Sequence, residues 1–162
     1  MGARHSPCMR LALCLLGLHA SAAQPDVAQL VLEAKQLARA GDASGALAHL
    51  EAAEALASTA EIATLKGNVY TYLMRESAAG EAAYRRALEI EPKAWDAAFF
   101  LAKVISTQGP ARAEEAALAF DVAAALKPSN LATRLEQGAG WEAAGSFPVS
   151  YTHLRAHETD SY

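Results

Sequence analysis

The chain has 162 residues, of which 52% are hydrophobic and 20% charged, and this balance excludes an intrinsically disordered protein, because such proteins lack enough apolar residues for a core. The length suffices for one domain with a buried interior. The formal net charge is −4, without a cluster of basic residues, which argues against nucleic acid as a partner because duplex binding depends on clustered phosphate contacts.

The first 22 residues predict a cleaved secretory signal peptide. Arg4 and Arg10 flank the start of an apolar run, residues 11–18, and small residues follow at positions 20–23, as at a cleavage site. A membrane anchor, the alternative, needs roughly 20 apolar residues, and this run is far shorter. We therefore expect an exported protein of the periplasm or cell envelope, with a secretory lumen or the extracellular space as alternatives.

Both cysteines, Cys8 and Cys14, lie within this leader. The exported part would then contain none, which excludes a disulfide scaffold, a thiol enzyme and a cysteine-ligated zinc site. Such a protein is held together by packing alone.

Three segments after the leader share one pattern, at spacings of 34 and 36 residues. Each has a small, a large and a small residue at i, i+4 and i+7, which places a narrow apolar stripe on one helix face. The small residues allow close approach of a neighbouring helix. The members are Ala46, Leu50 and Ala53; Gly80, Tyr84 and Ala87; and Ala116, Phe120 and Ala123.

A further helical stretch precedes each of these segments, at residues 27–40, 61–74 and 95–108, and each ends near a turn. Pro92 and Pro128 end two of the second helices, since proline cannot donate the helical hydrogen bond. The order helix, turn, helix, turn predicts an all-α protein built from repeated helix pairs.

These residues resemble the tetratricopeptide repeat (TPR). Leu101-Ala102 with Ile105, and Gly67 with Tyr70, match the family's first helix, and residues 85–95, RRALEIEPKAW, resemble its junction between repeats. The resemblance implies an α-solenoid with repeats at about 27–60, 61–94 and 95–130 and a partial one at 131–147. The sequence departs from the family by one extra residue in the second repeat's turn, two in the third, and Ser58 in place of proline.

The resemblance also implies a function. First helices of TPR proteins line a concave groove that binds extended or helical peptides. Cations beside aromatic residues there favour a partner with acidic and apolar residues. The family's chaperone-binding subset grips a C-terminal carboxylate, but Val31 and Phe100 stand at two of its clamp positions, which argues against that subset. The implied groove residues are Val31, Lys35, Arg39, Asn68, Tyr72, Phe99 and Lys103.

The sequence predicts neither catalysis nor a cofactor. His49 is the only histidine between the leader and residue 147, and adjacent acids such as Glu114 and Glu115, or the nearby Glu89 and Glu91, are typical of a solvated helix face. We expect a scaffold for protein–protein interaction or complex assembly. The alternative is the N-terminal TPR region of a longer enzyme, for example a glycosyltransferase or peptidase.

The last residues follow another pattern. Residues 149–159 read VSYTHLRAHET, which matches the translation of a transposase adapter from sequencing libraries without a mismatch. This predicts that residues 148–162 are not native and that the protein's own sequence stops at Phe147; a His-rich metal-binding tail is the alternative. The fourth repeat would then lack its second helix. We expect Leu135 and Trp141 to expose an apolar face, so that the last helix frays or drives self-association.

Overall fold

The computed structural model describes residues 26–145, and this range contains seven α-helices and no strand. The helices are α1 (Val27–Ala40), α2 (Ala43–Leu56), α3 (Ala60–Asn68), α4 (Ser77–Ile90), α5 (Trp95–Ser106), α6 (Ala113–Leu126) and α7 (Leu131–Ala143). A π-helical turn, η2 (Val69–Leu73), continues α3, and a 3-10 turn, η3 (Pro110–Arg112), precedes α6. Within residues 26–145, no helix is both long and apolar enough to span a bilayer. The leader and the tail predicted from the sequence lie outside these residues.

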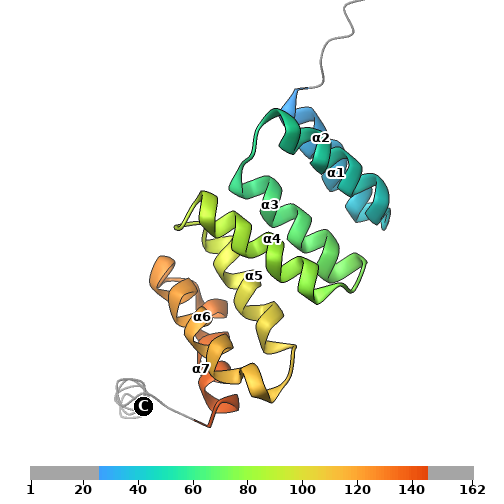
Figure 1. The fold of residues 1–162 in the computed structure, drawn as a ribbon. Helices are drawn as coiled ribbons and strands as arrows, with labels where there is room; N and C mark the ends of the chain where they lie inside the picture. The colour runs from blue at the N-terminus through green and yellow to red at the C-terminus, as the bar shows by residue number, and fades with distance from the viewer. Residues whose placement is uncertain (1–25, 146–162) are drawn as a thin grey trace, which may run out of the picture.

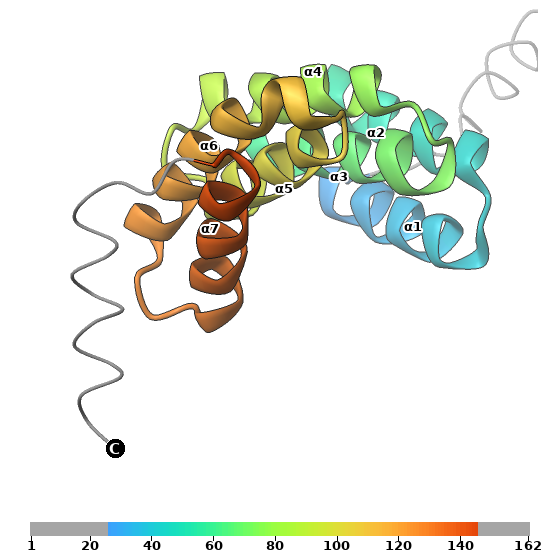
Figure 2. The same ribbon diagram turned by 90° about the horizontal axis from the view of Figure 1, so that it is seen from below.

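Consecutive helices pair and stack along the chain. The contacts join α1 to α2, α3 to α4 and α5 to α6, and α7 packs on α6 (Figure 1). Figure 2 shows an arch in which α2, α4 and α6 form the outer layer, while α1, α3, α5 and α7 lie along the inner side. The predicted all-α solenoid is confirmed.

The repeated stripe forms the core of each pair. The large residues Leu50, Tyr84 and Phe120 are at most 1% exposed. The small residues on either side of them are equally buried, and they let the paired helices approach closely. These small residues are Ala46, Ala53, Gly80, Ala87, Ala116 and Ala123.

Side-chain caps fix the start of three helices. Asp42 accepts a hydrogen bond from the Gly45 backbone N–H at 2.9 Å, which is also the main reason that the pKa of Asp42 lies below its ordinary value. Asn130 accepts from the Thr133 N–H at 3.0 Å, and Thr59 caps α3 in the same way. Such caps satisfy backbone donors that have no partner within the helix.

The extra residue of the second repeat lies within the first helix and not in the turn, where the sequence placed it. The Met74 N–H donates to the Val69 carbonyl at 3.1 Å, five residues back, so the helix widens into the π-helical turn η2. Arg75 then ends it with a left-handed φ of 63°. The two extra residues of the third repeat lie at the 3-10 turn η3.

The expectation that Trp141 would be exposed was wrong. Its side chain is only 7% exposed, because it turns toward α6 and its indole N–H donates to Asp121 Oδ1 at 3.0 Å. Gln137 donates to the same oxygen at 2.6 Å. Leu135, by contrast, is 65% exposed. The existing helix α6 thus covers half of the apolar face that we expected to be open.

Candidate functional site

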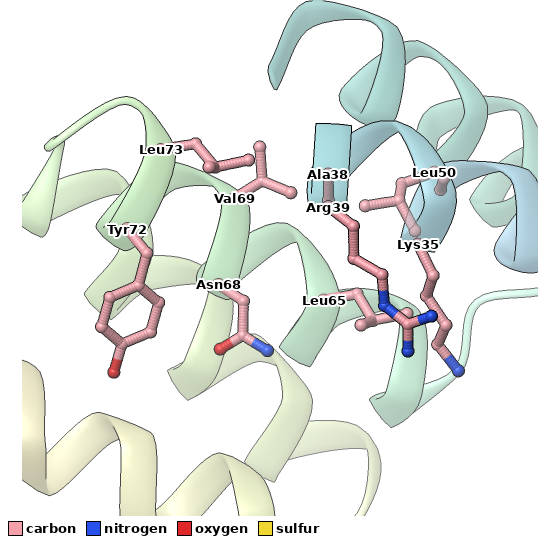
Figure 3. A pocket seen from close by; sticks show the side chains of 10 residues that line it. Lys35, Ala38, Arg39, Leu50, Leu65, Asn68, Val69, Tyr72 and Leu73 are labelled. Carbon is pink, nitrogen blue, oxygen red and sulfur yellow. The ribbon is translucent and has the colours of Figure 1, made fainter. Parts of the chain in front are cut away.

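A cleft of about 400 Å³ opens between the first helix pair and the second. Side chains of α1 form one wall and those of α3 and η2 the other, and α2 contributes one residue (Figure 3). None of the lining residues is acidic. They are Ala34, Lys35, Ala38, Arg39, Leu50, Leu65, Asn68, Val69, Tyr72 and Leu73.

The cleft exists because the first junction between pairs is filled less completely than the second. The first pair contacts α3 and η2 mainly through α2, and α1 and α2 contain no phenylalanine, tyrosine or tryptophan. At the second junction α4 packs directly on α5, and the stacked rings of Tyr84 and Phe100, 5.9 Å apart, occupy the space. Aliphatic side chains alone leave a hollow at the first junction.

The floor of the cleft is apolar and its mouth is open to solvent. Ala34, Leu50 and Val69 are 1–3% exposed and belong to a hydrophobic core that the first pair shares with α3 and η2. Tyr72 and Leu73, at the mouth, are 42% and 37% exposed. An apolar group that enters from solvent would therefore continue the existing core.

Two cations stand on the α1 wall. Lys35 Nζ lies 2.7 Å from Glu61 Oε1, so its charge is already paired. Arg39 forms no ion pair with any residue between 26 and 145. The guanidinium of Arg39 extends along the wall toward Leu65 (Figure 3). The rim of an apolar cleft thus carries an uncompensated positive charge, which attracts anionic groups.

Asn68 and Tyr72 provide the polar groups of the opposite wall. The Tyr84 hydroxyl donates to Asn68 Oδ1 at 2.8 Å, which fixes the amide so that its nitrogen points toward α1 (Figure 3). Burial raises the pKa of both Tyr72 and Tyr84 above the ordinary value of 10, so both hydroxyls remain neutral at physiological pH. The wall therefore offers neutral donors and acceptors and no negative charge.

No family model matches the chain, and no curated protein is similar to it in sequence. Solved structures share its architecture. The crystal structure of MamA has a TM-score of 0.67 with 21% identity over 84% of this chain and 76% of its own. A second MamA structure has a TM-score of 0.65 with 22% identity over 75% and 65%. The first TPR of Spaghetti (RPAP3), bound to the HSP90 peptide SRMEEVD, has a TM-score of 0.69 with 14% identity over 76% and 98%.

The fold is TPR-like. Identities this low show only the fold. This fold is the one that the resemblance in sequence implied. In this TPR-like arch the cleft involves first helices, the elements on the inner side.

Four of the seven residues predicted for the groove line the cleft: Lys35, Arg39, Asn68 and Tyr72. Val31 does not, because it is 8% exposed and packs in the core of the first pair. Leucines that the sequence did not single out, Leu65 and Leu73, complete the walls.

The remaining two predicted groove residues lie on α5, outside the cleft. The ring of Phe99 stacks on Trp95 at 5.4 Å between centroids, and Lys103 Nζ lies 5.9 Å from the Phe99 centroid. This aromatic pair and its lysine belong to the third repeat and are separate from the cleft between the first two repeats.

The strongest electrostatic cluster ties the second helix pair to the third. Glu81 of α4 accepts from both terminal nitrogens of Arg112, at 2.8 and 2.9 Å, and from Arg85 at 2.8 Å. The guanidinium of Arg112 is the main reason that the pKa of Glu81 falls to about 2. Glu115, expected on a solvated face, also pairs with Arg112, at 2.7 Å. These contacts are structural, since every charge in the cluster is paired.

The polar contacts of His49 stay within the first helix pair. Its Nδ1 lies 2.9 Å from the Gly45 carbonyl and its Nε2 lies 3.3 Å from Glu33 Oε2. Over the described part of the chain, no three His, Cys, Asp or Glu side chains are grouped so that they could hold a metal ion. The cleft is a feature of this part that offers a site for a ligand.

Proposed function

We propose that the chain is an exported scaffold that binds a segment of a partner protein on the inner side of its arch, without catalysis of its own. The observation that carries this proposal is the apolar cleft between first helices with the unpaired Arg39 at its rim. A concave, largely preformed apolar cleft with a few polar groups is typical of a binding site. The peptide-bound TPR of Spaghetti supports the choice of a peptide segment as the ligand.

The segment is not held by the family's clamp for a C-terminal carboxylate. Recognition of a terminal carboxylate needs polar side chains at the clamp positions, but Val31 packs in the core and Phe100 stacks on Tyr84. An amidated and a free-acid form of one peptide would therefore bind this protein equally well.

In-cell photo-cross-linking tests the proposed function. A photoreactive phenylalanine analogue at Tyr72, which is 42% exposed at the mouth of the cleft, should capture a partner protein. The matched control places the analogue at Arg86, on the outer helix α4, where it should capture none. Capture from Arg86 alone, or from neither position, would contradict the proposal.

The proposed export rests on residues 1–22. N-terminal sequencing of the native protein should give a mature chain that starts close to Ala23. A native protein that keeps its leader would contradict export by cleavage.

A further inference from the structure

We infer that the cleft between α1 and η2 holds one bulky apolar side chain of the partner segment, leucine or aromatic, and that Arg39 pairs with an acidic residue next to it. This inference rests on the proposed function and adds the chemistry of the ligand. The cleft then acts as an anchor, and the rest of the segment crosses the inner side of the arch.

The composition of the cleft selects an apolar group. Six of its ten lining residues are aliphatic, and the deepest of them belong to the core. A polar group placed there would lose its hydrogen bonds to water without replacement. The volume of about 400 Å³ lies within the range of roughly 300–1,000 Å³ for ligand sites. A leucine or aromatic side chain fits this space and gains by leaving water.

The charge at the rim selects the neighbouring residue. Arg39 has no carboxylate partner between residues 26 and 145, and no acidic side chain lines the cleft. Lys35 is neutralised by Glu61 at 2.7 Å, so Arg39 is the cation available to an incoming carboxylate. A basic segment would meet repulsion from the same side chain, and such repulsion is how interfaces reject wrong partners.

The π-helical turn η2 carries three of the side chains of the far wall, Val69, Tyr72 and Leu73. The hydrogen bond from Met74 to Val69 adds one residue to the turn that carries Tyr72 and Leu73. In an uninterrupted α-helix each residue advances by about 100°, so the turn sets the direction of every residue after it. Turns of this kind occur often at functional sites.

Selection from a library of random twelve-residue peptides displayed on phage tests the inference without a known partner. The full chain is the bait. We expect enriched peptides to carry a leucine or aromatic residue within two positions of an aspartate or glutamate. Individual peptides should then bind at least tenfold more weakly to Arg39→Glu, which reverses the rim charge, and to Ala38→Trp, which fills the cleft.

Two variants serve as controls. Arg86→Glu makes the same change in charge at an exposed position of the outer helix α4, away from the cleft, and should bind as the unchanged protein does. Lys103→Glu changes the charge beside the aromatic pair of α5 and tests whether peptides bind there and not in the cleft. Circular dichroism verifies that each variant is folded, and Arg39→Glu, an exposed position, keeps the test valid if Ala38→Trp does not fold.

The outcomes separate the inference from the proposed function. If binding is lost in Lys103→Glu but not in Arg39→Glu, the inner side binds peptides elsewhere and the cleft inference is wrong. Enrichment of basic peptides also overturns the inference. Both proposals fail if no peptide is enriched, or if none of the three inner-side variants weakens binding.

Discussion

At the residue scale, the close approach of paired helices depends on a glycine, Gly67, which has no side chain. A Cβ on Gly67 would lie 2.5 Å from the ring of Tyr84. Gly67→Ala should therefore destabilise the protein by up to about 2 kcal/mol, because overpacking costs about 1–3 kcal/mol and alanine returns about 1 kcal/mol as helix propensity. Urea unfolding measures the difference.

The control is the same substitution after Tyr84→Ala, which removes the ring. There Gly67→Ala should be neutral or stabilising, since the two residues would no longer collide. An equal loss in both backgrounds would mean that close approach is not the cause.

Arg75 is the one described residue other than glycine with a positive φ, 63°, at a turn where the other two pairs have Gly41 and Gly109. A residue with a side chain costs about 1–2 kcal/mol in this left-handed conformation, and glycine avoids that cost. Glycine also makes the unfolded chain more flexible, which offsets part of the gain in stability. We expect Arg75→Gly to stabilise the protein by about 0.5–1 kcal/mol in thermal unfolding. Gly41→Ala should lower stability by a similar amount, and a loss in Arg75→Gly would contradict this explanation.

Glu81 makes the stability of the fold depend on pH. Because its pKa is about 2 in the folded protein and ordinarily 4.5, its ion pairs stabilise the fold fully above about pH 4.5 and progressively less as the pH falls to about 2. Glu81→Gln should remove on the order of 1 kcal/mol at pH 7 and flatten this acid-side decline. Denaturant titrations at several pH values measure it, and an unchanged slope would show that the cluster does not contribute.

At the element scale, α7 at one end of the stack, like α1 at the other, packs mainly on a single helix, in this case α6. Trp141 and Gln137 both donate to Asp121, and these contacts hold the helix in place. Trp141→Ala should reduce hydrogen-exchange protection in α7 and leave α3 to α6 unchanged. A loss of protection spread evenly over all helices would show that α7 is not a separate unit of stability.

The exposed face of α7 supports a proposal about self-association. Leu131 and Leu135 are 69% and 65% exposed on one side of the helix. If this face pairs copies of the chain, Leu135→Glu should shift the protein toward monomer in sedimentation equilibrium. The same sedimentation profile for both proteins would contradict self-association through this face.

The sequence predicted those parts of the structure that depend on local periodicity. Leu50, Tyr84 and Phe120 were expected in the core because their spacing from small residues repeats along the chain. The position of the extra residue in η2 and the direction of Trp141 depend on contacts between helices, which periodicity does not reveal. For the same reason the sequence indicated Arg39 and Tyr72 but not Leu65 and Leu73, whose role depends on a junction between pairs.

At the scale of the whole molecule, the stack of pairs is uneven, and this unevenness creates the cleft. The second and third pairs are joined by stacked rings and by the Glu81–Arg112 cluster. The first junction has aliphatic contacts and two single ion pairs, Lys35–Glu61 and Lys66–Glu54. In a linear stack each pair contacts only its neighbours, so a ligand that bridges the first junction should strengthen it. We therefore expect a bound peptide to increase hydrogen-exchange protection in α1 and α3 more than in α5 and α6.

A charge swap between Arg39 and the ligand tests the central claim most directly. The measurement is the affinity of a selected acidic-apolar peptide, and of the same peptide with lysine in place of the acid, for the unchanged protein and for Arg39→Glu. We expect the acidic peptide to bind the unchanged protein at least tenfold more tightly than the variant, and the lysine peptide to show the opposite preference. Equal affinities of each peptide for both proteins would contradict the claim that the cleft and Arg39 recognise the partner.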